Sequence, residues 1–150
     1  MQDQVERVFD RIVESVRKDF EAGKEPFPHA ILLDGDEPRA VVGLGFIDDL
    51  TKQFTFTFLL PQIIKIHRPT ACIVVLPCRM RRLVKDVPLL ESDVEDVVMV
   101  HEIDAVKLQS VLIVKRKGKA EVIELEEEKM QTPLLDPVRE VLKEIWSDMI

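Results

Sequence analysis

Apolar residues recur at every third or fourth position near both ends of the chain, and this spacing predicts a helix at each end. The first repeat stops before Gly23 and contains Val5, Val8, Phe9, Ile12, Val13, Val16 and Phe20. The second follows Asp136 and Pro137, a pair typical of a helix start. Its apolar face contains Val138, Val141, Leu142, Ile145 and Met149, with Trp146 on the flank.

Short apolar runs separated by turn residues predict six strands between these helices. Their ranges are 29–34, 39–46, 70–83, 96–101, 110–116 and 120–125. Residues 35–38 and 116–119 supply hairpin turns, and residues 87–96 form a polar loop. The run within 70–83 is apolar at successive positions, which indicates a central strand buried on both faces. Pro77 lacks an amide donor, so strand pairing should end or bulge there.

Residues 50–67 fit two patterns. As a helix, the segment carries a stripe of Leu50, Phe54, Phe58 and Gln62, with Leu59, Ile63 and Ile66 beside it. Against a helix, the Phe-Thr alternation over 54–58 resembles a strand, and Pro61 would kink or break a helix. We favour the helix, since residues 59–66 follow a helical period better, and a strand followed by a turn stays the alternative.

These elements predict one α+β domain over residues 1–150, built on a mostly antiparallel sheet and flanked by N-terminal, middle and C-terminal helices. We expect the helices to pack on one face of the sheet. Hydrophobic residues make up 46% of the chain and charged residues 33%, as in globular proteins. No apolar run approaches the roughly 20 residues of a membrane span. The N-terminus lacks the apolar block of a secretory signal, so we expect a cytoplasmic protein.

Charge is distributed unevenly along the chain, although the formal net charge is −7. Residues 51–85 contain no Asp or Glu but seven basic residues, whereas the rest holds 28 acidic and 14 basic ones. Acidic neighbours in the fold would neutralise this segment, and we favour that explanation. Alternatively, its 65–85 part binds an anionic ligand. The candidate ligand-binding residues are then Arg68, Arg79, Arg81, Arg82 and Lys85.

Candidate catalytic and metal-binding residues are few. Cys78 lies beside several arginines in the sequence, which would lower the pKa of its thiol, and His101 is its possible partner. Cys72 and Cys78 are too far apart along one strand to form a disulfide. The three histidines do not follow a metal-binding spacing, and the carboxylates between Asp34 and Asp49 are typical of turns and caps. We therefore predict no metal ion and no cofactor.

The Gly43-Leu44-Gly45-Phe46 stretch invites a binding-loop interpretation. A dinucleotide loop needs a third glycine where this chain has Asp48. Together with Arg39, residues 43–46 resemble the carboxylate-binding loop of PDZ domains, but the later turn and helix of that family have no counterpart. We interpret the two glycines as small strand residues, with a helix of the same chain packed over them.

The sequence thus favours a non-enzymatic protein-interaction or regulatory module. Its partner would be another protein or a second copy of the chain, the acidic part of one copy meeting the basic segment of the other in a homodimer. The first alternative is nucleic-acid or anionic-ligand binding through residues 65–85, which the scarcity of aromatic stacking surfaces disfavours. The second is a small enzyme that uses Cys78 or the Asp34–Asp49 carboxylates.

Overall fold

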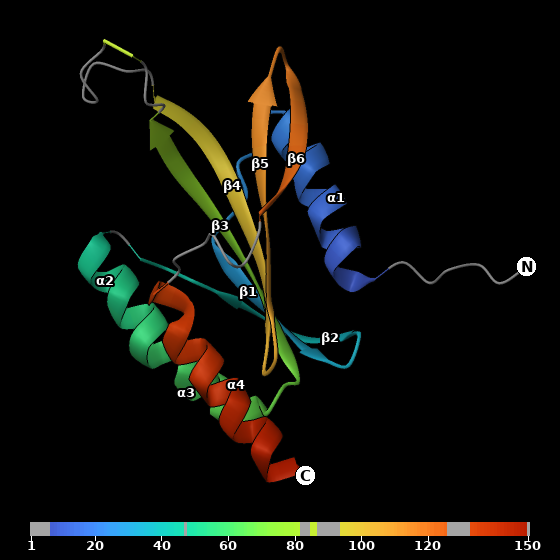
Figure 1. Cartoon of the computed structure of the whole chain (residues 1–150), viewed down its shortest axis with the longest axis vertical. Coiled ribbons are helices and arrows are strands. Elements are labelled where there is room, and N and C mark those ends of the chain that lie inside the picture. The colour runs from blue at the N-terminus through green and yellow to red at the C-terminus, as the bar shows by residue number, and fades with distance from the viewer. Residues whose placement is uncertain (1–6, 47, 82–84, 87–93, 126–132, 150) are drawn as a thin grey trace, which may run out of the picture.

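The computed structural model describes residues 7–46, 48–81, 85–86, 94–125 and 133–149 (Figure 1). A six-stranded antiparallel sheet has the order β2-β1-β3-β4-β5-β6. The strands are β1 (His29–Asp34), β2 (Glu37–Gly43), β3 (Ala71–Arg81), β4 (Val94–Asp104), β5 (Leu108–Arg116) and β6 (Lys119–Leu125). The helices are α1 (Val8–Glu21), α2 (Asp49–Phe54), η1 (Thr55–Leu59), α3 (Leu60–His67), η4 (Pro133–Leu135) and α4 (Asp136–Met149). The predicted α+β class is confirmed.

Helices cover both faces of the sheet, so the expectation that they share one face is wrong (Figure 1). Helix α1 packs on one face, while η1, α3 and α4 pack on the other. Strand β3 shows why. Its alternate residues Ile73 and Val75 belong to the core under α1, whereas Cys72 and Val74 belong to the opposite core. Strands that are apolar on both faces need cover on both sides.

Strand β3 is central, as predicted, with Cys72–Leu76 buried. The prediction that strand pairing ends near Pro77 is right only on the side of β3 that faces β1. Pairing of β3 with β1 reaches only Val75, but on the other side Pro77 pairs in register with Val98 of β4. A proline can occupy a paired strand where its missing N–H would point to the unpaired edge.

The middle segment is a continuous helix from Asp49 to His67, so the strand alternative is wrong. Asp48 caps its start: the Asp48 carboxylate accepts the Thr51 N–H at 2.8 Å. Pro61 does not break the helix, because the preceding turn is a π-helical one in which the Leu60 N–H reaches back to the Thr55 carbonyl. A wider turn accommodates the proline ring and its missing donor.

Both predicted hairpin turns are present. In the β5–β6 turn, Lys117 and Gly118 have φ of 54° and 78°, the left-handed pair that a tight two-residue hairpin requires. Strand β4 begins at Val94 and so takes in the end of the predicted loop, of which residues 87–93 lie outside the described part. Helix α4 begins at Asp136 as predicted, and Val138, Val141, Leu142 and Ile145 are buried. The side chain of Met149 lies outside the described residues. Among the described residues, no helix is both long and apolar enough to span a membrane.

Candidate functional site

The helix from Asp49 to His67 exposes a row of large apolar side chains. We call this row the apolar ridge; it consists of Leu50, Phe54, Phe58, Leu59 and Ile66. Leu50 and Ile66 are 76% and 77% exposed, and the least exposed member, Leu59, is still 48% exposed. The rings of Phe54 and Phe58 stack on each other with centroids 5.7 Å apart. Clustered exposed apolar side chains typically mark a surface that binds another molecule.

The opposite face of the same helix packs into the core. Phe56, Leu60 and Ile64 are each 0% exposed and contact the sheet and α4. The stripe of Leu50, Phe54 and Phe58 that the sequence shows therefore lies on the solvent side. Because residues four apart are neighbours on a helix surface, the ridge is continuous over its length except at Gln62.

The two ends of the ridge differ in charge. Asp48 and Asp49 are exposed at the N-terminal end, and Lys65, His67 and Arg68 are exposed at the C-terminal end. Between Thr51 and Arg68 the helix carries no acidic residue. The ridge is thus an apolar surface with an acidic start and a basic end.

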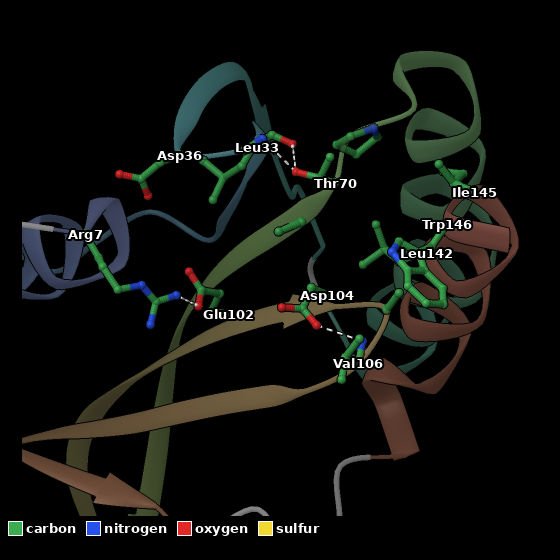
Figure 2. Close-up of a pocket in the computed structure, with 14 residues that line it drawn as sticks. Arg7, Leu33, Asp36, Thr70, Glu102, Asp104, Val106, Leu142, Ile145 and Trp146 are labelled. Atoms are coloured by element: carbon green, nitrogen blue, oxygen red, sulfur yellow. Dashed lines mark hydrogen bonds and ion pairs between the residues drawn. The ribbon is translucent and has the colours of Figure 1, made fainter. Parts of the chain in front are cut away.

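A separate cleft of about 400 Å³ lies at the end of the sheet that carries the β1–β2 and β4–β5 turns (Figure 2). Figure 2 shows Leu142, Ile145 and Trp146 of α4 on one side of the cleft. Arg7, Asp36 and Glu102 lie on the other side, and Asp104 stands between the two groups. The cleft therefore has an apolar wall and a polar wall.

The polar wall is organised around a buried carboxylate. Glu102 is 5% exposed and forms an ion pair with the Arg7 guanidinium, which also donates to Gln109 Oε1 at 3.2 Å. Asp36 accepts the Val8 N–H at 3.2 Å and so holds the start of α1 against the β1–β2 turn. Asp104 Oδ1 accepts the N–H groups of both Val106 and Lys107 at 2.7 Å. Each acidic group thus has a defined position in the wall.

The basic residues predicted to bind an anion are not gathered into one site. Arg68 precedes β3, whereas Arg79 and Arg81 lie at its far end; at about 3.3 Å per residue, Ala71 and Arg79 are roughly 26 Å apart. Arg68 pairs with Asp148 at 3.7 Å and Arg79 with Asp96 at 3.6 Å. Lys85 is exposed in a turn, and Arg82 lies outside the described residues.

Cys78 is not placed as an activated thiol. Burial raises the pKa of the Cys78 thiol, against a smaller lowering by Lys52. Alternation along β3 places Arg79 on the opposite face from Cys78. His101 does not serve Cys78 either, because Cys78 pairs with Val97, roughly 13 Å from His101 along β4. Neither Arg79 nor His101 is therefore placed to activate Cys78, which argues against the alternative of an enzyme that uses this thiol.

Thiol reactivity should follow from these positions. We expect Cys78 in the folded protein to react with a thiol reagent at pH 7 more slowly than a free cysteine, because less of it is thiolate. Cys72, whose pKa burial raises to about 12, should react only after unfolding. Absorbance of the released chromophore, with and without denaturant, measures both rates. A folded-state rate above that of free cysteine would contradict this placement.

Three of the carboxylates from Asp34 to Asp49 have structural partners. Asp34 pairs with Arg39 across the β1–β2 hairpin, Asp36 holds the start of α1, and Asp48 caps α2. In the described part of the chain, no three His, Cys, Asp or Glu residues are grouped so that they could hold a metal ion.

Gly43 and Gly45 do not lie under a helix, so that interpretation is also wrong. A side chain at Gly43 would meet the Phe27 ring at 3.0 Å, and a side chain at Gly45 would meet nothing within 4 Å. Strand β2 ends at Gly43 rather than at Phe46, although the Leu44 N–H still donates to the Pro28 carbonyl at 2.9 Å. The absence of a side chain at Gly43 leaves room for the Phe27 ring.

Sequence reasoning missed one buried polar pair as well as the cleft. His101 Nδ1 lies 2.6 Å from Ser110 Oγ across the β4–β5 pairing, and both residues are 2% exposed. Burial lowers the pKa of His101 to about 4, so the ring is neutral at pH 7. Neither residue lines the cleft. The two side chains are hydrogen-bond partners inside the core. The register of the β4–β5 hairpin, which places His101 opposite Ser110, is the sequence signal that could have found this pair.

A scan against protein-family models, a search of curated proteins and a search of solved structures each find no match to this chain.

Proposed function

We propose that this chain is a self-associating interaction module and that two copies join through the apolar ridge. The observation that carries the proposal is the exposure of five large apolar side chains along one helix. Leaving them in water is unfavourable by roughly 25 cal/mol for each Å² of apolar surface. A partner that covers the ridge recovers this free energy.

The spacing of the ridge suits a second copy. Four of its residues and Gln62 follow one another at intervals of four residues, with Phe58 in the middle: Leu50, Phe54, Phe58, Gln62 and Ile66. If two such helices pack antiparallel about a two-fold axis at Phe58, Leu50 faces Ile66 of the other copy and Phe54 faces Gln62. Such a two-fold interface uses the same surface twice and must be complementary to itself.

Charge favours the same arrangement. In the antiparallel pair, Asp48 and Asp49 of each copy lie opposite His67 and Arg68 of the other, with Lys65 nearby. Opposite charges therefore meet at both ends of the interface, whereas a parallel pair would bring like charges together. The helix ends support this too, because the acidic residues lie at the N-terminal end and the basic ones at the C-terminal end.

Removal of the two stacked rings should separate the copies. We expect the wild-type chain to be a dimer by light scattering, and Phe54→Ser/Phe58→Ser to be a monomer at the same concentration. The substitution removes four rings per dimer and should raise the dissociation constant at least about 100-fold. Circular dichroism should show an unchanged fold, because both rings are solvent-exposed in the single chain.

A matched control removes apolar surface elsewhere. Val41 on β2 and Val122 on β6 are exposed on the two edge strands. Val41→Ser/Val122→Ser should leave the dimer intact. A wild-type monomer at high concentration would overturn the proposal, and so would a dimer that survives loss of both rings but not loss of the two valines.

A further inference from the structure

We infer that the cleft at the end of the sheet binds a small organic cation, an ammonium group carried on an apolar body. None of the ridge residues lines this cleft, so the inference goes beyond self-association. Its volume of about 400 Å³ falls within the range of small-molecule sites, roughly 300–1,000 Å³. The cleft also combines an extended apolar wall with a few positioned polar groups, as such sites do.

The charge of the lining selects a cation. Asp36, Glu102 and Asp104 line the cleft against one basic side chain, Arg7. The Arg7 guanidinium is engaged by Glu102 and Gln109, which leaves Asp36 and Asp104 uncompensated within the lining. In the described part of the chain, each of these two aspartates uses Oδ1 for backbone N–H groups. None of these three bonds uses an Oδ2 atom.

The apolar wall selects an organic cation rather than a metal ion. Leu142 and Ile145 line this wall together with the half-exposed indole of Trp146, and Val106 lies near them (Figure 2). An indole face attracts organic ammonium groups as well as apolar carbon. The acidic residues are spread along the polar wall and are not grouped to hold a metal ion in the described part of the chain.

The position of Trp146 gives a direct readout, because the chain has one tryptophan and no tyrosine. Phenethylammonium is the probe, with 2-phenylethanol and 3-phenylpropanoate as neutral and anionic probes of similar shape at constant ionic strength. We expect saturable change in Trp146 emission with the ammonium, and affinities at least about tenfold weaker for the other two. N-acetyltryptophanamide corrects for simple quenching.

One pair of variants ties the binding to the polar wall. Asp104→Asn keeps an oxygen for the turn N–H groups but removes the charge, and should weaken binding of the ammonium about tenfold. Asp96→Asn makes the same change on β4 away from the cleft and should have no effect. Equal affinity for ammonium and alcohol, no saturable response, or equal effects of the two variants would overturn the inference. Preference for the carboxylate would do so as well, since it would assign the site to an anion held by Arg7.

Discussion

Replacing Phe56 with alanine should lower the free energy of unfolding by about 3–5 kcal/mol, the usual cost of deleting a buried aromatic ring. Phe56 is fully buried in the core between the middle helix and the sheet, with the Phe46 ring 6.4 Å away. The loss combines the transfer free energy of the ring with the cavity that remains. Urea denaturation followed by circular dichroism measures it.

Phe58→Ala is the matched control, two residues further along the same Phe-Thr-Phe-Thr-Phe run. Its ring is 58% exposed, so in the isolated chain the substitution should cost less than about 1 kcal/mol. Because dimerisation adds stability, the comparison is made at a concentration where light scattering shows monomer. In a strand, Phe56 and Phe58 would share one face, so equal losses would contradict the helix described above.

Lowering the pH from 6.5 to 4 should destabilise the protein through His101 by about 3 kcal/mol. Burial lowers the folded-state pKa of His101 from 6.5 to about 4. In this window the unfolded chain takes up a proton that the folded chain rejects, so stability falls as pH falls. Below the folded-state pKa both states are protonated and this loss stops growing. Urea midpoints measured across the window give the slope.

A double variant isolates this contribution. His101→Val/Ser110→Val replaces the cross-strand polar pair with an apolar one and leaves neither partner unsatisfied. Its stability should lose most of its slope between pH 6.5 and 4, whereas His67→Gln, at an exposed histidine, should keep the wild-type slope. Asp48 does not account for this slope. Its hydrogen bonds with Thr51 lower the Asp48 pKa below the usual 3.8, so its contribution to the free energy of unfolding is lost only at more acidic pH. A wild-type slope in the double variant would contradict a neutral buried His101.

The element types could be predicted because each depends on local pattern and on turn or cap residues. The strand order depends on contacts between distant segments, which the pattern does not encode. The apolar run of β3 does indicate cover on both faces of the sheet, but it does not say which helix covers which face. The middle helix shows the limit most clearly. Phe54, Phe56 and Phe58 are equally apolar, so composition does not say which of them faces the core. The π-helical turn before Pro61 sets the rotation of the second half of this helix relative to the first. The sequence period predicts the buried face only for a regular helix.

The cleft could not be predicted because its walls come from five separate parts of the chain. No local sequence motif joins Arg7, Asp36, Glu102 and Trp146. They line one cleft because the start of α1, the β1–β2 turn, the end of β4 and helix α4 lie at the same end of the sheet. The reverse holds for Cys78 and the arginines beside it in the sequence. They are adjacent in sequence, but neighbouring side chains on a strand point to opposite faces.

A charge-swap mixing experiment tests the antiparallel dimer most directly. Lys65→Glu/Arg68→Glu makes the basic end of the ridge acidic, and Asp49→Lys cancels the charge of Asp48 at the acidic end. Each variant alone should dimerise more weakly than wild type, because the attraction between opposite charges at the two ends of the interface is lost. Sedimentation velocity of the equimolar mixture should show a heterodimer that is tighter than either homodimer, since acidic residues meet basic ones at one end and the introduced lysine meets the introduced glutamates at the other. A mixture that sediments as the sum of the separate variants would contradict the two-fold pairing of apolar ridges.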